Sequence, residues 1–339
     1  MITIIADDFS GAAELAGIAA AHGFKAEVQT QFDPGTDAEV VAVDTDTRLK
    51  SEDEAARIVG EITRQIVAAK PTWIYKKTDS VLRGHIRAEI EAILAVTGQQ
   101  DCCFVPANPS KGRIVVDGRY WVNGMPLNET VFAQDPDHPR RSAVVRELLG
   151  RSTVIHTPDV RTREDLGHTP GAGTLAAGAA DFFTELIGGS PVMPVKAKTQ
   201  ASLLVCGSLA AWEMRRAEEM QQRGFVVKTI DEPVSPAIWQ TTSRLMLAIG
   251  PRRDVSPEQL TAELMDAALP LIDVQPDLRI GLEGGATAMA FIRRMGWTRF
   301  EVVPEGFTGV GSLRPPGGPL FCVKPGSYPW PDECFACQD

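Results

Sequence analysis

Short apolar runs alternate with helical patterns through the first third of the chain. Ile2 to Ala6 is a continuous apolar run of the kind buried in a parallel sheet, and shorter runs begin at Val40, Trp73 and Cys103. Between these runs, apolar residues recur every three or four positions, which is typical of one buried helix face. Strands separated by helices of this length predict βαβ units and a mostly parallel sheet.

Capping residues mark helix starts in both halves of the chain. Ser51-Glu52-Asp53-Glu54 is a capping box. Ser256-Pro257-Glu258-Gln259 has an N-cap serine, a proline at the first helical position and a glutamine three residues after the cap. Residues 167–178 are instead rich in Gly, Ala, Thr and Pro, and residues 188–191 read Gly-Gly-Ser-Pro, which favours a break. A second series of apolar runs follows from Leu203 onwards.

The length of the chain also favours two domains. With 339 residues it is longer than one α/β domain usually needs. We place the break between residues 188 and 200, which gives an N-terminal domain of residues 1–190 and a C-terminal domain of residues 200–339. A cleft between domains is a usual place for a ligand. The predicted fold class is therefore α/β, with two mostly parallel sheets and an interdomain active-site cleft.

Charge and hydropathy narrow the range of partners. The 34 basic and 44 acidic residues give a net charge of −10, and no run of Lys or Arg offsets it. A nucleic-acid binder needs a concentrated basic patch, so we expect no nucleic-acid partner. The apolar runs are strand-sized, and the first residues lack the basic region of a secretory signal, so we expect a cytoplasmic protein with no membrane partner. A homo-oligomer is compatible with the sequence.

The cysteines and histidines do not indicate a metal centre. Of the six cysteines, only Cys334 and Cys337 have the spacing of a metal-ligand or redox pair, and a second such pair is absent. We interpret this pair as incidental to the C-terminal tail, although its role stays open. The five histidines lack metal-ligand spacing.

Two polar segments follow predicted strands of the first half. Asp7-Asp8-Phe9-Ser10-Gly11 lies where a strand turns into a helix, at the edge where open α/β sheets bind ligands. Its paired carboxylates could bind a cation, accept a hydroxyl proton or orient a polyol. Lys76 to Gly84 gathers two cations, an acid, a hydroxyl and Arg83, and an arginine fork can hold a carboxylate by two parallel hydrogen bonds. By itself this second segment could equally be a solvated loop with a helix cap.

Glycine turns follow predicted strands of the second half. Cys206-Gly207-Ser208 and Glu283-Gly284-Gly285-Ala286-Thr287 each precede a helix, and Lys324-Pro325-Gly326 follows the last strand. Backbone N–H groups at a helix start, without a side chain on the glycine, are suited to phosphate. None of these turns is a Walker A sequence or a dinucleotide fingerprint. Three such turns in one domain nevertheless favour a nucleotide site.

Taken together, these motifs resemble the four-carbon acid sugar kinase family. The resemblance spans nearly the whole chain, and Val122 to Leu127 and Phe132 to Pro136 also take part in it. It implies a substrate domain followed by a nucleotide-binding domain, and the transfer of a phosphoryl group from ATP, with Mg²⁺, to a hydroxyl of threonate, erythronate or an oxo-tetronate. It further implies catalytic residues (Asp8 and Asp79), substrate-binding residues (Asp7, Lys77, Ser80, Arg83 and Asn123) and ATP-binding residues (Ser208, Glu283, Gly284, Gly285, Ala286, Thr287 and Gly326).

Two departures from the family pattern keep other functions open. The family usually has an acid after the paired glycines, where this chain has Ala286, and a small hydroxyl residue where it has Glu283. These differences are compatible with a sugar-acid sensor whose nucleotide site is degraded. A nicotinamide-dependent dehydrogenase built on the first domain is the other alternative, and the missing glycine-rich fingerprint after Ile5 disfavours it.

Overall fold

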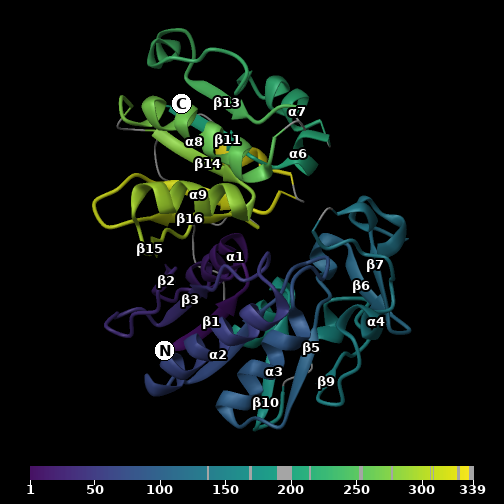
Figure 1. Ribbon diagram of the computed structural model, residues 1–339. Helices are drawn as coiled ribbons and strands as arrows, with labels where there is room; N and C mark the ends of the chain where they lie inside the picture. Colours follow the sequence, from purple (N-terminus) through teal and green to yellow (C-terminus); the bar gives the residue numbers. More distant parts are fainter. Residues whose placement is uncertain are drawn as a thin grey trace. The chain divides into compact units, whose positions relative to one another are not determined.

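The protein, described here from a computed structural model, consists of two compact units, Met1–Val192 and Met193–Asp339 (Figure 1). The structure describes residues 1–135, 137–167, 170–188, 201–213, 215–251, 255–275, 278–305, 307, 309–326 and 329–335. Each unit is built on a sheet whose strands are mostly parallel and are connected by helices. The predicted α/β fold class is therefore confirmed.

The main sheet of the first unit is parallel throughout its described pairs. Its centre pairs Ala6 with Asp44 on one side and with Lys77 on the other, so three neighbouring strands end at the same edge. The strands are, in order across the sheet, β2 (Ala26–Gln29), β3 (Val40–Asp44), β1 (Ile2–Ala6), β4 (Trp73–Lys77), β10 (Thr174–Gly178), β5 (Asp101–Val105) and β9 (Ile155–His156).

Helices cover both faces of this sheet. α2 (Glu52–Ala68) and α3 (Ile86–Thr97) pack against each other, as do α1 (Phe9–Ala21) and α5 (Ala180–Ile187) (Figure 1). The predicted capping box begins α2, because the Ser51 hydroxyl accepts a hydrogen bond from the backbone N of Glu54 at 3.3 Å. A short helix, α4 (Val145–Leu149), completes the unit.

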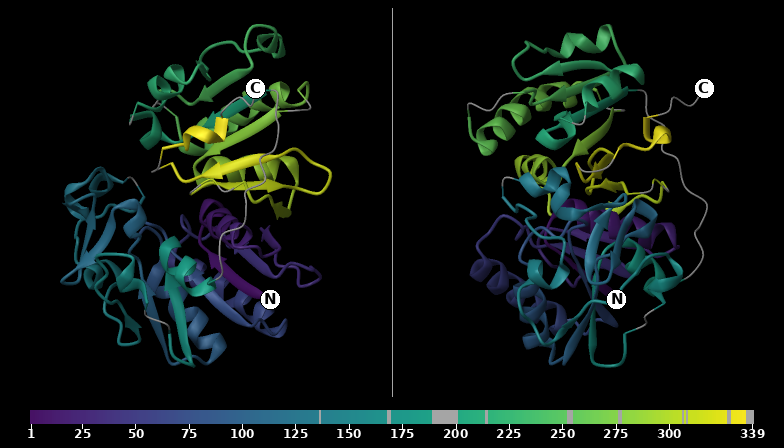
Figure 2. Two further views of the ribbon diagram at one scale, coloured as in Figure 1. Left: turned by 180° about the vertical axis from the view of Figure 1, so that it is seen from behind. Right: turned by 90° about the vertical axis from the view of Figure 1, so that its right-hand side faces the viewer.

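A small antiparallel sheet stands beside the main sheet of the first unit (Figure 2). It consists of β6 (Arg113–Val116), β7 (Arg119–Val122) and β8 (Met125–Pro126). Asn123 and Gly124 form the turn between β7 and β8 with φ of +50° and +80°. This is the two-residue hairpin that an Asn-Gly pair favours, because both residues tolerate positive φ.

Some strands of the first unit's main sheet lie where the apolar pattern predicts none. β2 is a short strand with polar residues, β9 has two residues, and β10 lies in the Gly- and Ala-rich segment of residues 167–178. β10 needs small residues, because a Cβ on Gly178 would come within 2.0 Å of the carbonyl oxygen of Val105. A central strand rich in glycine and alanine lacks the apolar signal on which strand prediction depends.

Among the residues that the structure describes, the second unit has a seven-stranded sheet of mixed direction. The first five strands across it are parallel, and the last two run antiparallel to their neighbours. In order across the sheet they are β12 (Val226–Thr229), β13 (Arg244–Ala248), β11 (Ala201–Cys206), β14 (Leu278–Glu283), β17 (Phe321–Lys324), β16 (Gly311–Arg314) and β15 (Arg299–Val302).

Four helices accompany this sheet in the described part of the second unit: α6 (Leu209–Glu213), α7 (Arg216–Gln222), α8 (Pro257–Ile272) and α9 (Gly285–Met295). The predicted N-cap of α8 is present, with the Ser256 hydroxyl accepting from the backbone N of Gln259 at 3.2 Å. Among the described residues of the whole chain, we find no helix with the length and apolarity that a membrane span requires.

Candidate functional site

Three neighbouring strand ends of the first unit bring together a cluster of aspartates around one arginine. Asp7 and Asp8 follow β1, Asp79 follows β4, and Arg48 lies in the turn after β3. The Arg48 side chain contacts all three carboxylates: Nε lies 2.7 Å from Asp7 Oδ2, Nη2 2.9 Å from Asp8 Oδ1 and Nη1 3.5 Å from Asp79 Oδ1. Arg48 belongs to no motif in the sequence, and its contacts with the three carboxylates place it in the candidate site.

Asp7 and Asp8 have different environments. Asp7 is buried and forms a two-point pair with Arg48, whose Nη2 also donates to Asp7 Oδ1 at 3.0 Å. Burial alone would raise the pKa of Asp7, but the Arg48 and Lys76 charges hold it below its usual value. Asp8 is the N-cap of α1 and accepts from the backbone N of Gly11 at 2.9 Å and from the Ser10 hydroxyl at 2.6 Å. Its side chain is 13% exposed, compared with 3% for Asp7, so Asp8 is the more accessible carboxylate.

Asp79 holds Arg83 by a bidentate pair. Nε of Arg83 lies 3.0 Å from Asp79 Oδ2, and Nη2 lies 2.8 Å from Oδ1. Oδ2 also accepts from the backbone N atoms of Val81 and Arg83 at 3.0 and 3.2 Å. Burial would raise the pKa of Asp79, but the Arg83 and Arg48 guanidinium groups lower it well below its usual value. The remaining Arg83 nitrogen, Nη1, lies 3.5 Å from Asp135 Oδ2.

The lowered pKa of Asp79 predicts a pH-dependent loss of stability. A carboxylate whose pKa is lower in the folded than in the unfolded state stabilises the fold above the unfolded pKa of about 4, and this contribution disappears as pH falls towards the folded pKa. We expect Asp79→Asn to lower the free energy of unfolding by about 2–4 kcal/mol at pH 7. The difference from wild type should narrow below about pH 4.

Urea unfolding at pH 7 and pH 3 measures this effect, with the exposed Asp137→Asn as the control. A difference between Asp79→Asn and wild type that is as large at pH 3 as at pH 7 would contradict the assignment.

A fourth aspartate, Asp44, ends β3 beside this cluster. Its Oδ1 accepts from the backbone N of Asp46 at 2.9 Å, whereas its buried Oδ2 has no hydrogen-bond partner among the residues that the structure describes. Burial and the neighbouring Asp46, Asp8 and Asp7 carboxylates raise the pKa of Asp44 well above its usual value. The sequence pattern did not mark Asp44, because a single acid after an apolar strand carries no specific signal.

The other predicted substrate residues form contacts of their own within the first unit. Lys77 is buried near Glu14, with Nζ 3.4 Å from Glu14 Oε2. Ser80 is buried, and its carbonyl oxygen accepts from the Tyr120 hydroxyl at 2.8 Å. Asn123 contacts Gly112 in the small antiparallel sheet, donating its backbone N–H to the Gly112 carbonyl at 2.7 Å. Of the seven predicted catalytic and substrate residues, four thus belong to the aspartate–arginine cluster (Asp7, Asp8, Asp79 and Arg83), and Asn123 does not.

Three glycine turns meet at neighbouring strand ends of the second unit. Gly207-Ser208 follows β11, Gly284 follows β14 and Gly326 lies two residues after β17. A Cβ on Gly326 would come within 2.4 Å of Ser208 Oγ, and a Cβ on Gly207 within 2.3 Å of Thr287 Oγ1. Side chains at these glycines would therefore collide with the hydroxyl residues that line the turns.

Gly284 is the N-cap of α9, with φ of +100°. The free N–H groups of the first turn of this helix, which begins at Gly285 and contains Ala286 and Thr287, can bind an anion. The structure therefore brings Ser208, Gly284, Thr287 and Gly326 together at one edge of the sheet. This arrangement is compatible with a phosphate group against the backbone of the turns.

Glu283, in contrast, is fully buried and bonded within the protein. Its Oε1 lies 2.8 Å from Lys324 Nζ and 3.0 Å from Arg216 Nε, and its Oε2 accepts from Trp330 Nε1 at 3.1 Å. Burial lowers the pKa of Lys324, although the neighbouring Glu283 charge opposes this shift. These contacts neutralise an acid that would otherwise repel phosphate.

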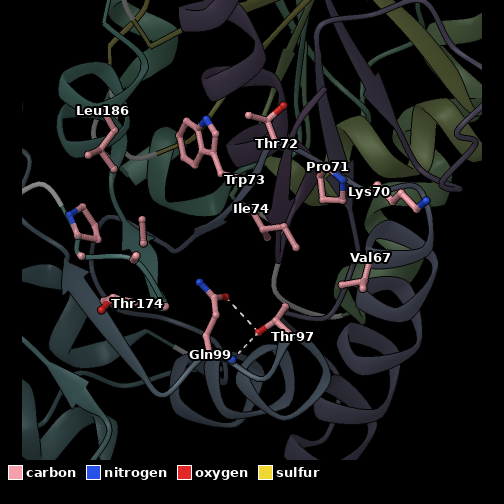
Figure 3. A pocket seen from close by; sticks show the side chains of 15 residues that line it. Val67, Lys70, Pro71, Thr72, Trp73, Ile74, Thr97, Gln99, Thr174 and Leu186 are labelled. Carbon is pink, nitrogen blue, oxygen red and sulfur yellow. Dashed lines mark hydrogen bonds between the residues drawn. The ribbon is translucent and has the colours of Figure 1, made fainter.

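A pocket of about 620 Å³ lies at the amino-terminal ends of strands in the first unit's sheet, opposite the strand ends that carry the aspartates (Figure 3). It is lined by residues at the start of β4 and β10 and at the ends of α2 and α3, among them Trp73, Thr174, Lys70 and Gln99. None of the predicted catalytic or substrate residues lines it, so its position does not support it as the reaction site. Within the described residues we also find no group of His, Cys, Asp and Glu arranged to hold a metal ion.

Comparisons with curated proteins find kinases of short sugar acids. The chain is 36% identical to a D-erythronate kinase of Heliobacterium modesticaldum, over 44% of this chain and 35% of that protein. It is 32% identical to a D-threonate kinase of Salmonella typhimurium, over 46% of this chain and 38% of that protein. A longer match, to a 3-oxo-tetronate kinase of Brucella melitensis, is 25% identical over 90% of this chain and 75% of that protein. The first two matches thus span little more than a third of the relatives' length.

Solved structures share the fold. A crystal structure of a Haemophilus influenzae protein is 16% identical with a TM-score of 0.70, over 97% of both chains. A Bordetella bronchiseptica protein, crystallised as a domain-swapped dimer with bound citrate, is 22% identical with a TM-score of 0.51, over 98% of this chain and 96% of that one.

A protein-family model also matches the chain. The model described as a sugar-binding N-terminal domain matches residues 2–226, which is more than half of the chain. The protein therefore belongs to the family of this sugar-binding N-terminal domain, and its resemblance to the four-carbon acid sugar kinases is confirmed.

Proposed function

We propose that the protein is a kinase that transfers the γ-phosphoryl group of ATP, bound with Mg²⁺, to a hydroxyl of a four-carbon sugar acid such as threonate, erythronate or an oxo-tetronate. The observation that carries this proposal is the cluster of Asp7, Asp8 and Asp79 around Arg48, at the strand ends of a sugar-binding domain. Such a cluster offers carboxylates for hydroxyl groups and guanidinium groups for an acid. The names of the curated relatives support the same substrate class.

The arginines are the groups that recognise the acid in this proposal. Arg48 and Arg83 are both held by aspartates, and their side chains are 14% and 24% exposed. A guanidinium group that is already oriented loses little freedom when it binds a carboxylate, and it has five donors to share. The citrate in the Bordetella relative supports an acidic ligand for this fold.

The glycine turns of the second unit bind the ATP phosphates in this proposal. Ser208, the turn from Glu283 to Thr287, and Gly326 surround the start of α9, where the helix dipole favours negative charge. Because the Glu283 charge is neutralised by Lys324 and Arg216, its place beside this turn is compatible with ATP binding. This observation disfavours the sensor with a degraded nucleotide site.

The reaction then needs little covalent chemistry from the protein. The substrate hydroxyl oxygen forms a bond to the γ-phosphorus, the bond from that phosphorus to the β–γ bridging oxygen breaks, and ADP leaves. Asp8 accepts the hydroxyl proton in this scheme, and the phosphate charge would be neutralised by Mg²⁺ brought in with the nucleotide. We still predict that the acid and the nucleotide bind in a cleft between the two domains. A cytoplasmic location and self-association are likewise predictions. The domain-swapped dimer of the Bordetella relative supports the last of these.

An ADP-release screen over short hydroxy acids tests the function and its acid site. We expect acid-dependent ADP formation with at least one tetronate. We also expect Arg83→Lys to raise the KM for that acid about tenfold with little change in kcat. Lysine keeps the charge, but it cannot hold Asp79 by two hydrogen bonds and still offer further oriented N–H groups to the acid.

No ADP formation with any acid, together with calorimetric binding of an acid but not of ATP, would instead favour the sensor. Turnover of NAD(P)H would favour the dehydrogenase. Wild-type kinetics for Arg83→Lys would assign Arg83 a structural role.

A further inference from the structure

Two histidines hold the turn that carries Arg48. Nε2 of His138 lies 2.7 Å from the carbonyl oxygen of Arg48, and Nε2 of His85 lies 2.6 Å from that of Lys50. Since a carbonyl oxygen only accepts, each imidazole carries a hydrogen on Nε2 and donates it. The two rings also contact each other, edge to face, with centroids 5.6 Å apart.

The turn itself has no regular secondary structure between β3 and α2, so its shape depends on such contacts. The backbone N atoms of Thr47 and Arg48 donate to the carbonyl oxygen of Asp7 at 3.0 and 3.2 Å. The histidines bind carbonyl groups of the same turn. The backbone of Arg48 is therefore fixed on both sides: its N–H donates to Asp7 after β1, and its C=O accepts from His138.

The segment that carries His138 also touches the second arginine. The backbone N of His138 donates to Asp135 Oδ1 at 2.8 Å, and Asp135 Oδ2 lies 3.5 Å from Arg83 Nη1. Arg140, two residues further on, binds the carbonyl oxygens of His138 and Leu82. Residues 135 and 137–140 thus connect the Arg48 turn with the Arg83 segment.

We propose that His138 and His85 are positioning residues for acid recognition, which set the place of the Arg48 guanidinium group by holding the backbone of its turn. This inference rests on the proposed function, because it gives Arg48 a task in binding the acid. A turn that shifts by a fraction of an ångström moves the guanidinium group away from its carboxylate partners, and binding geometry is sensitive to such shifts.

Three variants of His138 separate hydrogen bonding from packing. His138→Gln keeps an N–H donor, His138→Phe keeps the ring volume without a donor, and His138→Ala removes both. We expect His138→Ala and His138→Phe to raise the KM for the acid about fivefold, with kcat and the KM for ATP within about twofold of wild type. His138→Gln should recover most of the loss. His156→Ala, at an exposed histidine on β9, is the matched control and should leave all three constants unchanged.

Hydrogen–deuterium exchange of the ligand-free protein gives a second measurement that does not depend on activity. The amides of Thr47 and Arg48 should exchange faster in His138→Ala than in wild type, and at the wild-type rate in His156→Ala. Unchanged exchange, or a wild-type KM for the acid in His138→Phe, would overturn the inference. If the wild-type protein is inactive and His138→Ala still accelerates exchange of these amides, the proposed function is refuted. The same result would support the contact by which His138 fixes the backbone of the turn.

Discussion

Asp8→Asn is expected to lower kcat by about 10²–10⁴ while leaving the affinity for ATP nearly unchanged, because a positioned base contributes that much to proton transfer. Asp8 is the candidate for the base because it is the most exposed of the three carboxylates around Arg48. Asparagine caps a helix about as well as aspartate does, so α1 should keep its start. Steady-state kinetics and ATP calorimetry on the folded variant measure both quantities.

Asp7→Asn is the comparison for this variant. Both carboxylate oxygens of Asp7 already bind Arg48, so we expect its replacement to reduce stability and acid binding more than the chemical step. An Asp7→Asn enzyme without turnover, beside an Asp8→Asn enzyme of full kcat, would reverse the two roles. If both variants keep full kcat, the proton acceptor lies elsewhere, and Asp79 and Asp44 are the next residues to replace.

Gly284→Ala is expected to weaken ATP binding about 30-fold, or roughly 2 kcal/mol. Gly284 has φ of +100° and ψ of 142°, a conformation that residues with a Cβ avoid at a cost of about 1–3 kcal/mol. Relief of that strain would rotate the backbone at the start of α9, where the phosphate is proposed to lie. A Cβ there would make only ordinary contacts, 3.7 Å from Thr287 Oγ1 and 3.8 Å from Ser208 Cβ, so the expected loss comes from the backbone conformation.

The opposite end of the same helix provides the control. Gly296 also has a positive φ, +70°, and a Cβ on it would meet no atom within 4 Å. Gly296→Ala should therefore lower stability somewhat and leave the Kd for ATP within twofold. Equal Kd values for the two variants, measured by calorimetry on folded protein, would remove the start of α9 from the nucleotide site.

Local sequence signals predict the fold well where apolar runs are strong. Ile2–Ala6, Val40–Asp44 and Ala201–Cys206 are strands because nearly continuous apolar residues suit the buried positions of a mostly parallel sheet. β10 escapes prediction because its buried positions require small residues, as Gly178 shows. The direction of β16, which runs antiparallel to both of its neighbours β17 and β15, depends on chain reversal that no apolar pattern encodes.

The site is predictable only as far as its residues adjoin a recognisable strand. Asp7, Asp8 and Asp79 follow such strands, and the three glycine turns of the second unit do so as well. Arg48 lies in a polar turn without periodicity, 41 residues from Asp7, and only the pairing of β1 with β3 brings it to the cluster. His138 is further still, 90 residues from Arg48, and it acts through a backbone carbonyl that no motif can specify.

The hydrogen bond from Trp330 to Glu283 makes the end of the chain part of the proposed nucleotide site. Trp330 is fully buried, and its indole N–H satisfies one oxygen of an acid that no solvent reaches. A shortened chain that ends before Trp330 would lose this hydrogen bond and the indole ring that packs at the carboxylate, directly beside Gly284. Truncation, proteolysis or a tag inserted at this point would therefore disturb a turn that lies nearly fifty residues earlier in the sequence. The segment that contains Trp330 therefore stabilises the turn at Glu283 and Gly284, and expressed forms of the protein should retain it.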